Sequence, residues 1–255
     1  MENKLDKALE HFNKEEYNSA VEEFNSLIEE DPEDPYLYNN LGTSYYKLGK
    51  YDKAIESYLK ALKIDPNIQG IYQNLADVYL ANDDVSNALI VLEQAIIINP
   101  DNPGTRYHYA RVLMQEFRFD LAIEELEKVI DKAPENIDAH YDLAVAYFQV
   151  GNYTTAIVEY NKVKESIPKN PDIHYHLGIA YEANNEIDIA IDEFRKTIEL
   201  NPAYFLAYRQ LGVLYTAKKM YPEAIESLKK YLSLISVPEE KEEIEAIVKR
   251  LESLL

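Results

Sequence analysis

The stretch LGTSYYKLGKYDKAIESYLKALKIDPN, from Leu41 to Asn67, holds Gly42, Ala54 and Pro66 at two equal intervals of twelve residues. The same spacing returns along the chain with a period of 34 residues. An alanine occupies the Ala54 position in all seven copies: Ala20, Ala54, Ala88, Ala122, Ala156, Ala190 and Ala224. Repetition with this period is typical of a solenoid, in which each unit buries its apolar face only against its neighbours.

Each 34-residue copy has the pattern of two amphipathic helices. In the second copy, apolar residues recur at steps of three and four over 38–48 and again over 54–64. The small residue Gly42 predicts a close approach of the two helices, and Pro66 predicts the end of the second one. We therefore expect an all-α fold, an α-solenoid of seven helix pairs. The expected repeats are 1–34, 35–68, 69–102, 103–136, 137–170, 171–204 and 205–238.

Composition and charge exclude several classes of function. The chain of 255 residues has no cysteine, which excludes disulfides, thiolate zinc sites and cysteine nucleophiles. Its net charge of −20 repels phosphate backbones and anionic membranes, so we expect neither nucleic acid nor membrane as a partner. Residues 1–12 are charged throughout and lack the apolar run of a signal peptide, which predicts a cytoplasmic protein.

No set of residues in the sequence predicts catalysis, a metal or a cofactor. His108, Asp142 and His176 share one position in consecutive copies. A metal site there is disfavoured, because packed helices lie ~10 Å apart whereas zinc ligands lie about 2 Å from the ion. Hydrogen bonding to a peptide is the favoured role. The sequence therefore predicts a protein that is not an enzyme.

The chain resembles the tetratricopeptide repeat family. The residues that carry the resemblance in the second copy are Tyr38, Leu41, Gly42, Tyr45, Gly49, Tyr51, Ala54, Tyr58, Ala61 and Pro66. Tyrosine or histidine stands where the family often has tryptophan, which we expect to change only details of packing; these residues are Tyr38, Tyr72, His140, His174 and Tyr208. The resemblance implies a right-handed superhelix whose concave groove, lined mainly by the first helices, holds a partner segment.

The last residues, 239–255, are predicted to form a capping helix, because open solenoid ends need covering. Four apolar residues lie on one stripe of this helix: Ile244, Ile247, Val248 and Leu251. A monomer is expected, and Leu254 with Leu255 leaves dimerisation as the alternative.

One groove position is polar in every copy: Asp6, Asn40, Asn74, His108, Asp142, His176 and Gln210. In the family, asparagines at this position bind the backbone of an extended peptide. Asn40 and Asn74 match them, so the resemblance implies a peptide contact there. The alternative is a solvated helix face.

The neighbouring position carries Tyr107, Tyr141 and Tyr175 in three consecutive copies, then Arg209. Further groove candidates are Arg111, Met114, Val145, Phe148 and Ile179. Aromatic and apolar residues on a face that should meet water predict a binding patch, and packing between repeats is the alternative. Asp138 and Asp172 would favour a basic segment.

The preferred function is therefore a non-catalytic scaffold. It would bind an extended or helical partner segment, basic and apolar in character, in a groove centred on copies four to six. The alternative is a structural subunit of a multiprotein assembly that acts through its ends or its convex face.

Overall fold

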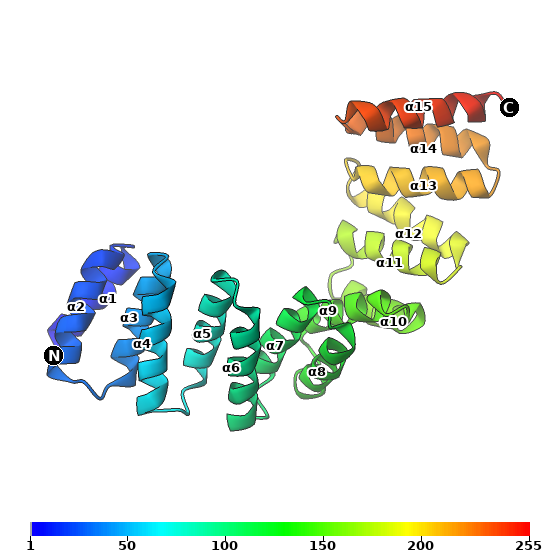
Figure 1. Cartoon of the computed structure of the whole chain (residues 1–255). Coiled ribbons are helices and arrows are strands. Elements are labelled where there is room, and N and C mark those ends of the chain that lie inside the picture. The colour runs from blue at the N-terminus through cyan, green and yellow to red at the C-terminus, as the bar shows by residue number, and fades with distance from the viewer. Residues whose placement is uncertain (1) are drawn as a thin grey trace. The chain divides into compact units, whose positions relative to one another are not determined.

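Fifteen α-helices joined by short turns make up the described part of the chain in this computed structural model (Figure 1). The structure describes residues 2–255, with the side chains of residues 4–238 and 240–255. The first eight helices are α1 (Glu2–Asn13), α2 (Tyr17–Glu30), α3 (Pro35–Lys47), α4 (Tyr51–Ile64), α5 (Gln69–Ala81), α6 (Val85–Ile98), α7 (Pro103–Gln115) and α8 (Phe119–Lys132). The others are α9 (Ile137–Gln149), α10 (Tyr153–Ser166), α11 (Pro171–Ala183), α12 (Ile187–Leu200), α13 (Phe205–Ala217), α14 (Tyr221–Leu234) and α15 (Pro238–Glu252).

The helices form two compact units, one that ends at Pro134 and one that spans Glu135–Leu255. Within each unit, a helix packs mainly against the helices before and after it in the chain. Every predicted copy contributes one helix pair, as the repeat pattern predicts. The all-α solenoid expected from the sequence is therefore confirmed.

The conserved spacing of small residues marks the contact between the two helices of a pair. All seven alanines of the Ala54 position have no exposed surface. Gly178 shows how close the approach is, because a Cβ placed there would lie 2.6 Å from Cε1 of Phe194. The ring of Phe194 would have to shift to admit even a methyl group at this point.

The turn inside each pair has one fixed conformation. One residue of every turn has a positive φ, between 56° and 81°: Glu15, Gly49, Asp83, Phe117, Gly151, Asn185 and Lys219. Five of the seven residues are not glycine, so the turn does not require glycine, although all seven adopt the left-handed conformation that glycine favours. A side chain at this position costs about 1 kcal/mol.

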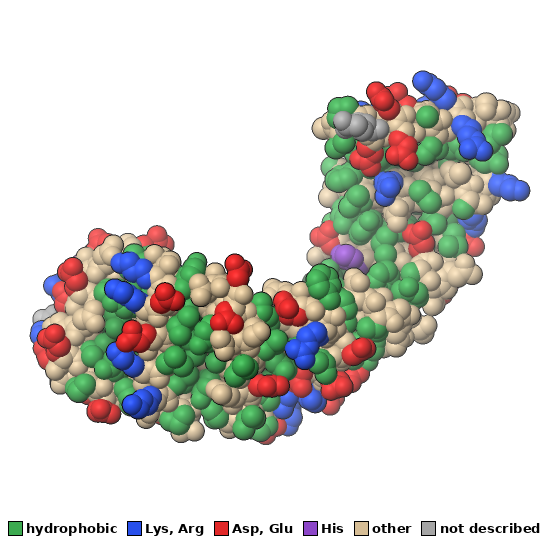
Figure 2. Space-filling view, in the orientation of Figure 1, with side chains coloured by type: hydrophobic (Ala, Val, Ile, Leu, Met, Phe, Trp, Pro, Cys, Tyr) green, Lys and Arg blue, Asp and Glu red, His purple; other side chains and the backbone are tan. Residues whose placement is uncertain are grey.

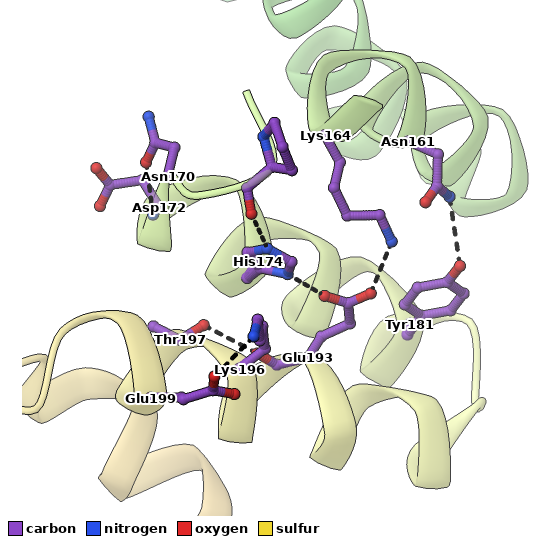
Figure 3. A network of polar contacts seen from close by, with 11 residues as sticks. Asn161, Lys164, Asn170, Asp172, His174, Tyr181, Glu193, Lys196, Thr197 and Glu199 are labelled. Atoms are coloured by element: carbon purple, nitrogen blue, oxygen red, sulfur yellow. Dashed lines mark hydrogen bonds and ion pairs between the residues drawn. The ribbon is translucent and has the colours of Figure 1, made fainter. Parts of the chain in front are cut away.

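In three copies, the residue at the position where the family often has tryptophan contacts a glutamate of the second helix. The pairs are Arg106 with Glu125, His140 with Glu159 and His174 with Glu193. His174 Nδ1 lies 2.5 Å from Oε2 of Glu193, and Lys164 donates to the other carboxylate oxygen at 2.9 Å (Figure 3). His140 contacts Glu159 in the same way at 2.6 Å. Both histidines are buried, and their copies form the same helix pair as the others, so the substitution changes a detail of packing, a glutamate contact, and not the fold.

The C-terminal helix α15 packs on α14 and begins one residue before the expected segment. Ile244, Val248 and Leu251 are buried, whereas Ile247 is 37% exposed. The sequence Ser236-Val237-Pro238-Glu239 predicts a capping box at the start of this helix, but the N-cap residue is Val237, with no side-chain cap hydrogen bond. The side chain of Glu239, its second member, lies outside the described residues.

Replacing Ala156 with glutamate should destabilise the second unit by several kcal/mol, against the roughly 1 kcal/mol typical of substitutions. The reason is that a charged side chain would be forced into a contact with no exposed surface. Urea unfolding followed by circular dichroism measures the loss. An unchanged unfolding midpoint would contradict the proposed packing of the pair.

Candidate functional site

The first helices of the second unit carry one stripe of accessible side chains each. The members lie at i, i+3, i+7 and i+10, which brings them to one side of a helix. They are Asp138, Tyr141, Val145 and Phe148 on α9; Asp172, Tyr175, Ile179 and Glu182 on α11; and Leu206, Arg209, Val213 and Thr216 on α13. All twelve are partly or fully exposed, and we call this set the first-helix face. Hydrophobic side chains gather along one edge of the second unit, over α11 and α13, with acidic ones among them (Figure 2).

A cavity of about 300 Å³ lies between α9, the end of α10 and the start of α11. Its lining residues are Ile137, Asp138, Tyr141, Val163, Ile167, Asn170, Asp172, Ile173 and His176. Val163 and Ile173 are buried and give it apolar walls, while Asp138 and Asp172 are exposed. This α9–α11 cavity therefore combines an apolar interior with two carboxylates open to solvent.

Tyr141 and His176 form the aromatic side of the cavity. The Tyr141 hydroxyl oxygen lies 2.9 Å from Nε2 of His176. The imidazole also stacks on the buried ring of Tyr160, with 5.8 Å between centroids and 14° between planes. Burial lowers the pKa of His176, and the nearby carboxylate of Asp172 opposes this effect. The Tyr141 hydroxyl and the His176 imidazole share this hydrogen bond, so the contact ties α9 to α11.

Tyr175 on α11 occupies the position that Tyr141 has on α9. Its ring contacts Phe194 at 5.7 Å and Tyr204 at 5.0 Å between centroids. The Tyr204 hydroxyl is hydrogen-bonded to Asp172, and burial together with this carboxylate raises the pKa of Tyr204. Tyr141 therefore contacts His176 of the next repeat, Tyr175 contacts rings of its own repeat, and both side chains are half-buried on the first-helix face.

Glu182 is a member of the first-helix face that sequence reasoning missed. The same position in the other copies is apolar in Phe12, Tyr46, Leu80, Met114 and Phe148, and Thr216 is the remaining exception. Burial raises the pKa of Glu182. The side-chain amide of Gln210 donates to its Oε2 at 3.3 Å. An acid in an otherwise apolar series was the signal that could have identified it.

The remaining candidates of the second unit are spread over three helices. Asp142, Val145 and Ile179 are half-buried, and the ring of Phe148 contacts that of Tyr153 at 5.2 Å. Arg209 Nε lies 4.0 Å from Oε1 of Glu240 at the start of α15. The guanidinium group is therefore partly engaged by the C-terminal helix.

The candidates of the first unit are joined by their own contacts. Asn39 links the two predicted asparagines: it donates to Asn40 at 3.5 Å and accepts from Asn74 at 3.0 Å. Further along this unit, His108 Nε2 lies 3.2 Å from Oδ1 of Asp77. The guanidinium of Arg111 lies 6.0 Å from the ring centroid of Tyr107, and Met114 is half-buried. A peptide backbone would compete with the Asn39 bonds for these asparagines.

The carboxylates of the first-helix face lack cations. Among the residues that the structure describes, no lysine, arginine or histidine forms an ion pair with Asp138, Asp172 or Glu182. Within the same part of the chain there is no cluster of three or more metal-ligating side chains, and no helix long and apolar enough to cross a membrane. The arrangement suits recognition of a positively charged group.

Family models match most of the chain. Tetratricopeptide repeat models match residues 35–68 and 175–239, and a TPR repeat model matches residues 8–49. The TPR domain of cytochrome c-type biogenesis protein H matches residues 72–174. The chain therefore belongs to the tetratricopeptide repeat family. A comparison with curated protein sequences found no match.

Several solved structures share the fold. The C-terminal part of a TPR repeat-containing protein from Cytophaga hutchinsonii is 21% identical, with a TM-score of 0.81 over 93% of this chain and 98% of that one. YrrB, described as a TPR protein with an unusual peptide-binding site, is 24% identical, with a TM-score of 0.65 over 74% of this chain and 98% of that one. MamA is 25% identical, with a TM-score of 0.62 over 67% of this chain and 93% of its own.

Acidification should weaken the second unit through His176. Its pKa lies below the ordinary value of 6.5, so the unfolded chain takes up this proton at a higher pH than the folded one. Between the two pKa values the unfolded state binds more protons, and the free energy of unfolding falls as the pH drops through 6.5. Urea unfolding from about pH 8 to about pH 5 should show a smaller loss for His176→Gln than for wild type. An equal loss in the free energy of unfolding for His176→Gln and wild type would contradict the role of His176 in this pH dependence.

Proposed function

We propose that this protein is a non-catalytic scaffold that binds a segment of a partner protein on the first-helix face of the second unit. The observation that carries the proposal is the α9–α11 cavity, in which Tyr141 and His176 stand beside apolar walls and an acidic edge. Half-buried aromatic residues are common anchors at protein interfaces, because they contribute large contact area at a low cost in conformational entropy. A peptide-binding site in YrrB supports a related use of the fold.

The partner segment is basic and apolar in this proposal. Acidic side chains that have no cationic partner among the described residues attract such a segment and repel nucleic acid and anionic membranes. A monomeric state and a cytoplasmic location stay predictions from the sequence.

The double variant Tyr141→Ala with Tyr175→Ala tests the face. After the partner is captured and identified by mass spectrometry, its affinity should fall by at least 2 kcal/mol, or roughly thirtyfold, because both anchors are lost. Both tyrosines also pack against an aromatic ring of the second helix of their own repeat, so some stability is lost too.

The matched control is Tyr208→Ala with Tyr221→Ala. These tyrosines are also half-buried, on α13 and α14, and neither belongs to the first-helix face. Urea unfolding compares the stability of the two double variants, and titration calorimetry well below both melting temperatures compares their binding. Equal affinity for the partner in both double variants would refute the proposal.

A second candidate function rests on the outer side of α6. Ile90 is 49% exposed and Ile97 is 76% exposed, seven residues apart on one stripe with Gln94 between them. The other copies carry mostly charged residues at the two isoleucine positions: Glu22, Glu56, Glu124, Val158, Asp192 and Glu226, then Glu29, Lys63, Asp131, Glu165, Glu199 and Ser233. An uncharged apolar stripe on a second helix favours assembly through the convex face.

The variant Ile90→Glu with Ile97→Lys installs charges that other copies have at these positions. Stability should stay within about 0.5 kcal/mol of wild type, because both side chains are well exposed. In the same capture experiment, loss of the partner from this variant together with retention by the tyrosine double variant would establish the assembly function. The reverse pattern would exclude it.

A further inference from the structure

The stripe of α11 has an acid at each end and apolar residues between them. Its members are Asp172, Tyr175, Ile179 and Glu182, and all are accessible. The stripes of the neighbouring first helices have an acid at one end, as α9 does with Asp138, or at neither end, as on α13. Helix α11 is therefore the one first helix of the second unit with this symmetric pattern.

Both acids have hydrogen-bond partners that carry no charge. Asp172 borders the α9–α11 cavity and is hydrogen-bonded to the Tyr204 hydroxyl. Glu182 is half-buried, and its described side-chain partner is the neutral amide of Gln210. Removing a carboxylate from water without a cation costs free energy, and burial raises the pKa of Glu182 accordingly. A cation from a ligand would remove that cost.

The distance between the acids is set by the helix. Ten residues separate Asp172 from Glu182, which corresponds to about 15 Å along the axis at 1.5 Å per residue. In an extended segment, every second side chain points to the same face. Residues four apart therefore share a face and are separated by about 13 Å. The flexible stems of two lysines cover the difference. The residue midway between them points to the same face and would meet Tyr175 and Ile179.

We propose that α11 selects a partner segment that carries two basic residues four positions apart with an apolar residue midway between them. The segment lies extended along the stripe. One cation pairs with Asp172, its aliphatic stem in the α9–α11 cavity, and the other pairs with Glu182. This inference rests on the proposed function and adds to it the charge pattern and spacing of the partner.

The test uses acetylated, amidated nonapeptides, titrated by calorimetry at low salt into the full chain. The reference peptide has Lys-Ala-Leu-Ala-Lys at its centre, flanked by alanine and glycine. Two peptides replace one lysine each by glutamine, and one replaces both. A further peptide has the same composition with the lysines two positions apart. The protein variants are Asp172→Asn, Glu182→Gln and, as a control, Glu245→Gln, whose side chain is exposed on α15.

The reference peptide should bind about fivefold more tightly than either single-glutamine peptide and than the peptide with closer lysines, since each partly exposed ion pair contributes about that factor. Toward Glu182→Gln, the reference peptide and one of the two single-glutamine peptides should bind with equal affinity. Toward Asp172→Asn, the same should hold for the reference peptide and the other single-glutamine peptide. Glu245→Gln should leave every affinity unchanged.

Three results would overturn the proposal. The first is equal affinity for the two lysine spacings, the second is an unaltered preference in Glu182→Gln, and the third is no binding of the reference peptide. None of them bears on the proposed function, which is judged with the captured partner and the tyrosine double variant. A captured partner that needs Tyr141 and Tyr175 but shows no lysine preference would leave the scaffold function standing and remove this inference alone.

Discussion

The close approach of two helices at one alanine is the contact on which every other feature of the molecule depends. Seven alanines without any exposed surface hold seven pairs in the same way, so that each pair presents an equivalent apolar side to the next. The first helix carries glycine or alanine at the position that faces the second helix, and at Gly178 the ring of Phe194 leaves no room for a Cβ. Once this contact is fixed, residues outside it are free to differ between copies, and recognition can use them.

The sequence predicted the helix pairs well because their determinants are local. Small residues and prolines recur at a fixed period, and both act through the backbone within one copy. Contacts between residues far apart in the chain escaped prediction. The pairing of His174 with Glu193 spans 19 residues and two helices, and the pattern of one helix does not contain it.

The candidate site was only partly predictable for the same reason. Tyr141, Tyr175 and His176 could be placed on groove positions from their spacing, but their mutual contacts depend on how the end of α10 meets the start of α11. The cavity exists only in that arrangement. Tyrosine also serves equally well as filler and as anchor, and the structure shows that these side chains lie between both uses. Glu182 was missed although its departure from an apolar series is visible in the sequence.

The histidine and arginine contacts with glutamate impose a rule on how such a chain can change. Copies with Arg106, His140 or His174 in the first helix carry Glu125, Glu159 or Glu193 in the second, whereas copies with tyrosine there carry serine or valine. Exchange of a single helix between the two kinds of copy would leave a buried carboxylate facing a phenol. The whole pair is therefore the smallest unit that duplication or recombination can transplant intact.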